Sequence, residues 1–317
     1  MKKISIVTPC FNEVDNIENL QIVVKKIMEQ VLDVQYEHIF IDNCSVDGTV
    51  EVLESLAKKD PKTLVIFNER NFGFSRSSYY GVIQATGDCV IYLMADFQDP
   101  PELIPIMINE WNKGAAIVAC IKTSSKENIL VYLIRSFYYN LMKKLTDGEH
   151  IEHFTGFGLY DKKFIRLMRE NADPYPYLRG MVAQYGFRIK KINYQQNLRT
   201  AGKTKFRFTG LFDLAMLGLV SSSRAPLRIL IIAGFIASTM SFVIGMIYLL
   251  QKILFWDSYQ EGVAGMAAAI FFLGSVQLFF LGVIGEYIGA TFTQVRKRPI
   301  VIERTRLNFS KVNDNEN

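Results

Sequence analysis

The chain has 317 residues, of which half are hydrophobic, with a formal net charge of +5 and four cysteines. This length suffices for one sizeable core and a further element, and the widely spaced cysteines are typical of reduced, packed residues. The basic residues form no platform interleaved with aromatic side chains, so nucleic acid is not expected as a partner.

Residues 1–205 alternate strand-like and helix-like segments. A β-rich run covers 4–8, where Pro9 is expected to end it, and apolar residues recur at helical spacing from 17 to 28. This βαβ alternation predicts a mostly parallel α/β sheet with its ligand crevice at the carboxyl ends of the strands. No G-x-G-x-x-G fingerprint follows the first strand, which argues against a dinucleotide oxidoreductase. Further strands are predicted at 36–41, 64–67, 90–93 and 116–121.

The segment 87–102 leads from a buried strand into a cluster of carboxylates and an amide. One residue separates Asp96 from Gln98, so in extended chain both side chains point the same way and their oxygens could share one cation. The alternative is a surface turn in which Asp96 or Asp99 caps the helix that the following prolines open.

Two charge-free segments of 22 residues follow, at 229–250 and 263–284. Each is long enough to cross a hydrocarbon core of about 30 Å as a helix, and a buried helical hairpin in a soluble domain is the alternative. The first segment lies far from the N-terminus, so it is not a signal peptide. Arg and Lys flank the outer ends, whereas the loop 251–262 carries one Lys against two acidic residues. The positive-inside rule therefore places both termini in the cytosol.

A set of ordered motifs spans almost the whole chain and resembles the family 2 glycosyltransferases that charge polyprenyl phosphate with a sugar. These include bactoprenol glucosyltransferases and dolichyl-phosphate mannose synthases. The motifs stand at 8–13, 42–49, 70–73, 96–101, 177–180, 199–206 and 285–289, ahead of Arg298-Pro299.

The resemblance implies a domain organisation. We expect a cytosolic GT-A catalytic domain at 1–205 and an interfacial amphipathic segment at 206–226. Two transmembrane helices at 227–290 and a cytosolic tail at 291–317 complete the chain. The protein would then lie in the cytoplasmic membrane as a multi-pass protein in contact with the lipid bilayer, and we also expect a homo-oligomer.

The resemblance also implies a donor site for a nucleotide sugar. A carboxylate at Asp42 suits the imide N–H of uracil, so a UDP-hexose such as UDP-glucose is expected. Asp96 and Gln98 would hold Mg²⁺ or Mn²⁺. For the turn at 70–73, the start of a helix is an equally good explanation of Asn71 and Gly73. The donor-binding residues would be Pro9, Phe11, Glu13, Asp42, Arg70 and Asn71.

Arg199 and Lys205 flank a glycine turn that resembles the family's diphosphate-binding turn. With Asp96 they would form the catalytic group, neutralising charge on the leaving UDP. The alternative is that both are juxtamembrane residues that meet lipid phosphate. A predicted helix at 128–145 offers Arg135 and Ser136 to the acceptor phosphate, with a plain core helix as its alternative.

Two positions depart from the family pattern. Met94 stands where many relatives carry a first Asp, and the stretch 155–161 lacks the carboxylate proposed as the base, which leaves Asp161 and His153 as the remaining candidates. Because the acceptor is a phosphate monoester and largely dianionic at cytosolic pH, a general base is dispensable.

We therefore expect direct displacement of UDP by polyprenyl (undecaprenyl) phosphate with inversion, giving a lipid-linked sugar for cell-envelope glycan modification. The alternatives are a processive polysaccharide synthase, whose Q-x-x-R-W signature is absent from the sequence, and a catalytically inactive membrane scaffold.

Overall fold

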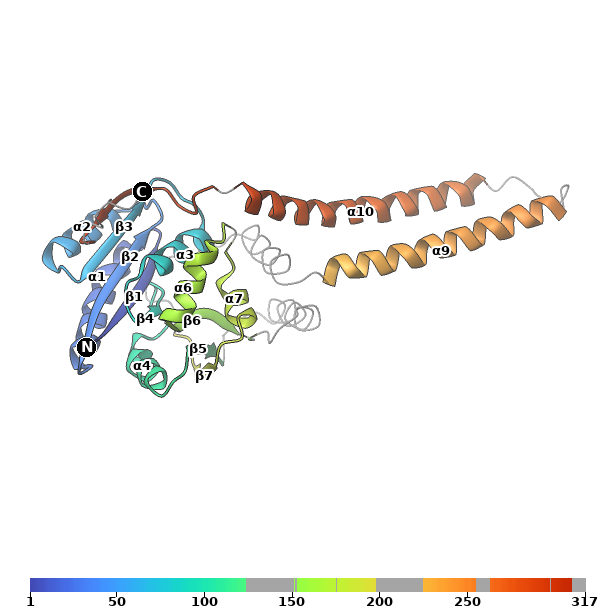
Figure 1. Cartoon of the computed structure of the whole chain (residues 1–317). Helices are drawn as coiled ribbons and strands as arrows, with labels where there is room; N and C mark the ends of the chain where they lie inside the picture. Colours follow the sequence, from blue (N-terminus) through green and yellow to red (C-terminus); the bar gives the residue numbers. More distant parts are fainter. Residues whose placement is uncertain are drawn as a thin grey trace.

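The structure, a computed structural model, describes residues 1–123, 151, 153–174, 176–197, 225–254, 263–296 and 298–309. In this part of the chain an eight-stranded sheet has the order β7-β5-β6-β4-β1-β2-β3-β8 (Figure 1). Its strands are β1 (Lys2–Cys10), β2 (Val34–Asp42), β3 (Thr63–Asn68), β4 (Cys89–Tyr92), β5 (Ile117–Lys122), β6 (Phe154–Asp161), β7 (Ile189–Tyr194) and β8 (Glu303–Leu307).

Helices cover both faces of this sheet. Neighbouring strands pair in parallel in β1–β2, β1–β4, β2–β3 and β5–β7, so the predicted mostly parallel α/β sheet is confirmed. The helices are α1 (Val14–Gln30), α2 (Thr49–Lys59), α3 (Phe74–Gln84), the 3₁₀ helix η1 (Pro101–Leu103), α4 (Ile104–Asn112), α6 (Lys162–Asn171), α7 (Leu178–Gln184), α9 (Ala225–Leu254) and α10 (Val263–Val295).

The central strands are apolar on both faces because each face has its own buried cluster. Ile6 and Phe40 share one cluster with α1, α2 and α4, whereas Val7 and Ile39 share the other with α3 and α6. Full burial of one such side chain contributes about 1.5–3 kcal/mol. Gly81 lets α3 approach closely, since a Cβ there would lie 2.8 Å from Ile41 Cγ2.

The expectation that Pro9 ends the first strand is wrong, because β1 continues to Cys10. Val7 accepts a hydrogen bond from Leu93 on the β4 side, so Pro9, two residues on, also turns its backbone toward β4. The β1–β4 ladder ends at Val7 and Tyr92. The missing N–H of Pro9 therefore removes no ladder hydrogen bond.

The segment expected as a cytosolic tail contributes an edge strand. β8 pairs antiparallel with β3, and the Asn308 side chain donates to the carbonyl groups of Ala57 (2.6 Å) and Thr63 (2.9 Å). The chain thus returns to the sheet after α10, a long-range pairing that no local pattern indicated.

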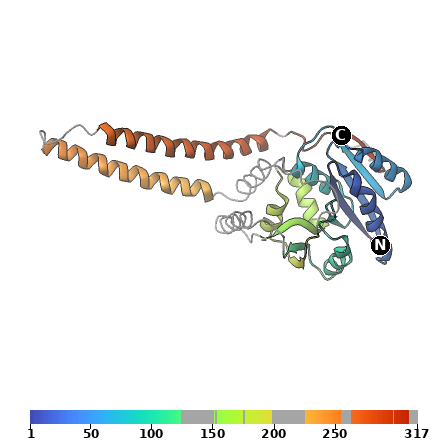
Figure 2. The same cartoon turned by 180° about the vertical axis from the view of Figure 1, so that it is seen from behind.

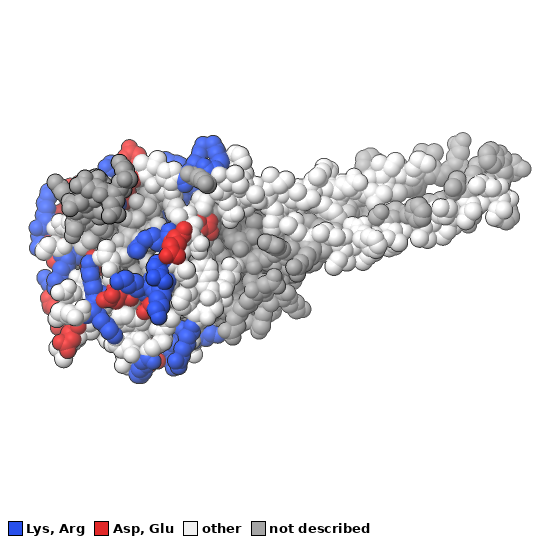
Figure 3. Space-filling model, viewed as in Figure 1, with Lys and Arg blue, Asp and Glu red and all other residues white. Residues whose placement is uncertain are grey.

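Helices α9 and α10 lie side by side and extend away from the sheet (Figures 1 and 2). Within the described residues, one stretch, Phe272–Val295, is long and apolar enough to cross a membrane, by length and composition. Its side chains are not buried in the protein; Phe272 and Phe279, for example, are exposed. In Figure 3 the charged side chains gather on the sheet domain, and the far half of the helix pair is white wherever it is described. A helical hairpin buried in a soluble core does not match this arrangement.

Candidate active site

The polar residues expected to bind a donor meet at the carboxyl edge of the sheet. Strands β4, β1, β2 and β3 are neighbours and parallel, so the loops that follow them lie at one edge. These loops carry Phe11 and Glu13 after β1, Asp42 at the end of β2, Arg70 and Asn71 after β3, and Asp96 and Gln98 after β4, while Pro9 is buried within β1.

The loops after β1 and β2 hold each other in place. Asn12 has a φ of 54°; its N–H donates to Ser45 Oγ (2.7 Å), and its side-chain oxygen accepts from the Val46 N–H (2.8 Å). The Glu13 N–H donates to Thr49 Oγ1 (2.9 Å). These contacts join the β1 loop to the residues that follow Asp42, a form of preorganisation that local sequence patterns do not reveal.

Asp42 is fully buried, yet one of its oxygens lacks a partner within the described residues. Oδ2 accepts a hydrogen bond from the Ser45 N–H (3.0 Å), whereas Oδ1 accepts none. Burial raises the pKa of Asp42, although hydrogen bonds from Ser45 and Cys44 oppose that rise. An unsatisfied buried acceptor costs about 1–3 kcal/mol. Such a cost is typical of a buried group that receives its hydrogen bond from a bound ligand.

Asn71 shapes the turn that starts α3. Its side-chain oxygen accepts from Asn43 Nδ2 (2.9 Å) and from the Gly73 N–H (2.8 Å), and Gly73 precedes the helix with a φ of 86°. The helix-start explanation of this turn therefore accounts for the Asn71 oxygen. Arg70 is exposed and its guanidinium lies 4.4 Å from the Phe72 ring centroid. Asn43, which the sequence reasoning did not single out, links this turn to β2.

The residues expected to bind a metal occupy one tight turn after β4, here called the metal turn (Asp96–Asp99). Asp96 is 8% exposed, and its Oδ1 accepts from the Gln98 N–H (3.2 Å). Gln98 Oε1 accepts from Gln196 Nε2 (3.4 Å). The chain between Asp96 and Gln98 is a turn, with Phe97 at a φ of 59°, and not the extended segment that the sequence suggested. Both residues still offer the hard oxygen donors that Mg²⁺ and Mn²⁺ prefer, and ligand and water oxygens would complete the shell. No group of three His, Cys, Asp or Glu gathers among the described residues.

The alternative role of Asp99 as a helix cap is wrong. Asp99 is 2% exposed, its Oδ1 accepts from the Tyr194 hydroxyl (2.6 Å), and η1 begins without a side-chain capping hydrogen bond. Burial raises the pKa of Asp99 to about 6, opposed by Tyr194, Lys122 and Arg179. The Asn197 N–H also donates to the Gln98 carbonyl group (3.2 Å). The end of β7 is therefore bound to the metal turn.

Several expected residues lie outside the described part of the chain: Arg199 and Lys205, Arg135 and Ser136 of the 128–145 segment, and all but the last two residues of the interfacial segment 206–226. Their roles stay predictions. The last two residues of the interfacial segment belong to α9.

Asp161 has a structural role. Its Oδ1 accepts from the Lys163 N–H (2.9 Å) at the start of α6, and its Oδ2 accepts from Trp111 Nε1 (2.8 Å). It pairs with Cys89 at the amino end of β4, so it lies away from the carboxyl edge. His153 precedes β6 with a φ of 57°.

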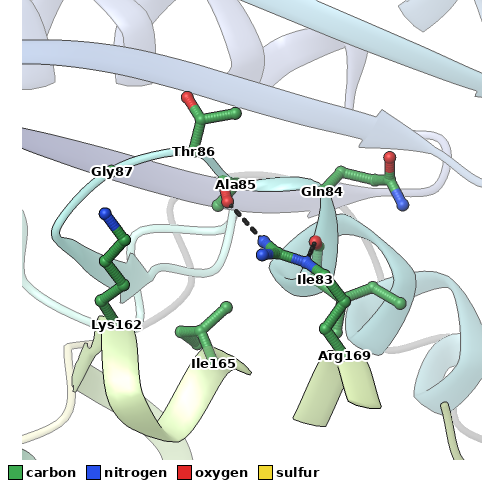
Figure 4. Close-up of a pocket in the computed structure, with 8 residues that line it drawn as sticks. All are labelled: Ile83, Gln84, Ala85, Thr86, Gly87, Lys162, Ile165 and Arg169. Atoms are coloured by element: carbon green, nitrogen blue, oxygen red, sulfur yellow. Dashed lines mark hydrogen bonds between the residues drawn. The ribbon is translucent and has the colours of Figure 1, made fainter. Parts of the chain in front are cut away.

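A cavity of about 380 Å³ lies at the opposite end of the sheet. Figure 4 shows Arg169 of α6 reaching across it to the Ile83 and Ala85 carbonyl groups, at 3.0 and 2.9 Å. Those bonds satisfy the last carbonyl groups of α3. The cavity also borders Gly87, which precedes β4, so it is separate from the carboxyl edge. We interpret it as a feature of the packing of the fold and not as a ligand site.

Comparisons with known proteins agree with this geometry. A family described as Glycosyl transferase family 2 matches residues 5–168, and the GtrB C-terminal hairpin matches residues 225–291. The chain is 31% identical over 306 residues to a prophage bactoprenol glucosyl transferase homolog of Escherichia coli (strain K12), covering 96% of this chain and 99% of that protein. It is 30% identical over 305 residues to bactoprenol glucosyl transferase of Shigella phage SfX, with the same coverage.

A solved structure shares the fold. Mannosyl-3-phosphoglycerate synthase from Rubrobacter xylanophilus superposes with a TM-score of 0.51 at 17% identity, over 74% of this chain and 75% of that one. The sheet domain therefore has a GT-A-like fold, as predicted.

Proposed function

Because this chain belongs to glycosyl transferase family 2, and is a glycosyltransferase, we propose that it moves a hexose from a UDP-sugar, such as UDP-glucose, to polyprenyl (undecaprenyl) phosphate. The relatives named bactoprenol glucosyl transferase support a lipid-carrier acceptor. The observation that carries the proposal is the buried Asp42 Oδ1, which has no partner among the described residues and lies at the carboxyl edge of a domain that continues into an apolar helix pair.

The donor's base would bind at the end of β2. A buried carboxylate oxygen without a donor accepts the imide N–H of uracil well, because both groups then exchange an unsatisfied state for a hydrogen bond. Phe11 and Glu13, on the adjacent β1 loop, and Arg70, beyond β3, flank that position. Pro9, which has no backbone N–H, lies buried in β1 at this edge. Asn71 holds the turn after β3.

The metal turn would hold the donor's diphosphate. Asp96 and Gln98 would bind Mg²⁺ or Mn²⁺, which supplies positive charge to the diphosphate as UDP leaves. Arg199 and Lys205 are proposed to act on the same diphosphate, and Arg135 and Ser136 on the acceptor phosphate. The acceptor phosphate is itself the nucleophile and attacks the sugar carbon with inversion, so the departure at 155–161 removes no essential group.

The chain's return to the sheet supports two membrane crossings. It leaves the sheet domain before α9 and rejoins it in β8, which pairs with β3. A single crossing by α10 would place β8 on the opposite side of the bilayer from β3. Two crossings, by α9 and α10, would remove that conflict, and the basic flanks support a cytosolic sheet domain. A homo-oligomer stays a prediction without structural support.

Membrane topology can be tested by cysteine labelling in intact cells. A single cysteine placed in the 251–262 loop should react with an impermeant thiol reagent, and a single cysteine on the sheet domain should not. Labelling of the sheet-domain position alone would reverse the proposed orientation, and labelling of neither position would contradict the two crossings.

Transfer is tested with purified protein, a set of UDP-hexoses and Mg²⁺ or Mn²⁺, with and without a short polyprenyl phosphate. The expected product is a lipid-linked single sugar that forms only when the acceptor is present. A polymer would identify a processive synthase instead, and no turnover of any donor would favour the inactive scaffold. Mass analysis of the lipid product identifies the sugar.

A further inference from the structure

A small pocket lies between the start of α3, the end of β4, the start of β6 and the start of α7. Its volume is about 40 Å³. We call it the Ser78 pocket. The residues that matter here are Phe74, Ser78, Tyr92, Thr155, Gly156 and Arg179.

The order of the strands places this pocket where the donor's sugar would lie. Asp42, proposed to bind the base, ends β2, and the metal turn, proposed to hold the diphosphate, follows β4. The sheet order is β6-β4-β1-β2, so a ligand that runs from base to diphosphate continues from β4 toward β6. The Ser78 pocket lies there, with Tyr92 from the end of β4 and Gly156 from β6 in its wall.

The pocket contains buried polar groups that the described protein does not fully satisfy. Ser78 is 5% exposed, and its Oγ makes no well-formed hydrogen bond within the described residues. Burial raises the pKa of the Tyr92 hydroxyl, while the nearby Ser78 hydroxyl and the Arg179 guanidinium oppose that rise. Arg179 Nε donates to the Thr155 carbonyl group (3.2 Å), which holds the guanidinium along the wall. Buried hydroxyl groups of this kind usually have partners.

The wall of the pocket includes a glycine with a positive φ. Gly156 has a φ of 104°, a conformation that other residues rarely adopt, and a Cβ there would lie 3.6 Å from the Tyr92 ring. Its position belongs to the stretch 155–161, where the family's carboxylate is absent.

We propose that the Ser78 pocket binds one hydroxyl or hydroxymethyl group of the donor hexose and thereby selects the sugar. This inference rests on the proposed function and adds the residues that set its sugar specificity. Aromatic walls with hydroxyl groups suit the mixed surface of a sugar, whereas a phosphate dianion would lose more hydration than one guanidinium, already bonded to Thr155, could replace.

The test compares donor analogues in the full-length protein. Wild type is assayed with UDP-hexoses and a short polyprenyl phosphate, and the 3-, 4- and 6-deoxy analogues of the sugar that it transfers follow. We expect wild type to favour the parent sugar over one analogue by about tenfold or more in kcat/KM, because the missing group leaves buried hydroxyls unpaired. Ser78→Ala should lower the parent's kcat/KM and bring that ratio close to one.

Two further variants make the result decisive. Arg179→Lys keeps the charge but loses the planar guanidinium, so it should lower the ratio of kcat/KM between the parent sugar and the analogue. If Ser78→Ala melts at a much lower temperature than wild type, the Arg179→Lys result decides whether the pocket selects the sugar. Tyr79→Phe is the matched control: Tyr79 lines the same wall, but its hydroxyl donates to the Met168 carbonyl group (2.5 Å). It should lower stability and leave the ratio as in wild type.

The failures can be told apart. If folded Ser78→Ala and Arg179→Lys keep the wild-type ratio for every analogue, the Ser78 pocket does not select the sugar, while the proposed function stands. If wild type transfers no UDP-hexose, the proposed function fails and the inference fails with it.

Discussion

Strand β2 carries two buried carboxylates that have opposite surroundings. Near its amino end, Glu37 accepts hydrogen bonds from Ser5 Oγ (2.6 Å) and the Thr86 N–H (3.0 Å), and Lys3 Nζ lies 2.5 Å from its Oε2. At its carboxyl end, Asp42 has one oxygen that accepts from Ser45 and one without a described partner. The same strand thus carries one carboxylate whose hydrogen bonds the protein supplies and one with an oxygen that accepts no hydrogen bond from the described residues.

The pKa values follow this difference. Burial alone would raise the pKa of Glu37, but the hydrogen bonds from Lys3, Ser5 and Thr86 outweigh it and the pKa is lowered. Burial raises the pKa of Asp42, and its fewer hydrogen bonds do not reverse the shift. A carboxylate whose oxygens are all hydrogen-bonded inside the protein stabilises the fold. A carboxylate at the carboxyl edge with an oxygen that lacks a described hydrogen bond is available to a ligand.

The largest expected effect is a loss of sugar transfer on substitution in the metal turn. Its absence would contradict the division between carboxylates that stabilise the fold and carboxylates that bind a ligand. Asp96→Ala should lower metal-dependent transfer by roughly 100-fold or more, because a charge that assists the leaving group is lost. Asp161→Ala is the control: it should cost about 1 kcal/mol of stability through its helix cap and leave turnover per folded molecule intact. Near-normal turnover by Asp96→Ala in Mg²⁺ or Mn²⁺ would remove Asp96 from the site.

The two carboxylates of β2 give the direct comparison. Asp42→Ala should raise the donor KM, with a loss of roughly 10-fold or more in kcat/KM, and should cost less stability than Glu37→Gln, because only its Oδ2 accepts a hydrogen bond among the described residues. Glu37→Gln should instead cost about 2 kcal/mol of unfolding free energy with unchanged kcat/KM. Urea unfolding and steady-state kinetics measure both quantities. Equal losses of stability and activity in the two variants would contradict the division of roles.

His38, next to Glu37, sharpens the comparison through pH. Burial lowers its pKa to about 3, below the ordinary value of about 6.5. Above pH 6.5 both folded and unfolded chains hold it neutral. As the pH falls below 6.5 only the unfolded chain takes up this proton, so stability is lost progressively down to about pH 3, by up to about 1.4 kcal/mol per pH unit.

The measurement for His38 is unfolding free energy against pH for wild type and His38→Gln. The difference between the two slopes isolates this group, and the glutamine can still bond to Thr8, whose Oγ1 lies 3.0 Å from His38 Nε2. The variant should be less sensitive to acid with unchanged donor KM. Parallel slopes would mean that His38 titrates equally in both states.

The smallest expected effect concerns the contact between β7 and the metal turn. Tyr194→Phe leaves the buried Asp99 without its 2.6 Å partner, which should cost about 1 kcal/mol of stability. Because the same turn carries Asp96 and Gln98, kcat should fall by less than in Asp96→Ala. The control is Tyr185→Phe, which should lower kcat less, because the Tyr185 hydroxyl of wild type is bonded to Asn171 at an exposed site. A kcat equal to that of wild type would show that the turn is held without Tyr194.

Much of the site's layout was predictable because parallel strands bring distant loops to one edge. The positions of Asp42, Asp96 and Gln98 at carboxyl ends of strands follow from the βαβ alternation alone. Asp99 was not predictable: a carboxylate before two prolines is typical of a cap, and only a tyrosine 95 residues away on β7 turns it into a buried pair. Likewise, nothing local in residues 303–307 indicated that they complete the sheet beside β3.

The amino-acid sequence by itself determined the order of the elements, the mostly parallel sheet, the apolar C-terminal helices and the edge where the chemistry gathers, because each follows from short-range periodicity and strand direction. The tertiary structure alone decided which buried polar groups are satisfied. Glu37 and Asp42 are both acidic residues of one strand, and their difference depends on partners such as Thr86, 49 residues from Glu37. Burial and hydrogen bonding between such distant residues exist only once the chain has folded, so residue type could not separate the structural carboxylate from the one left for a ligand.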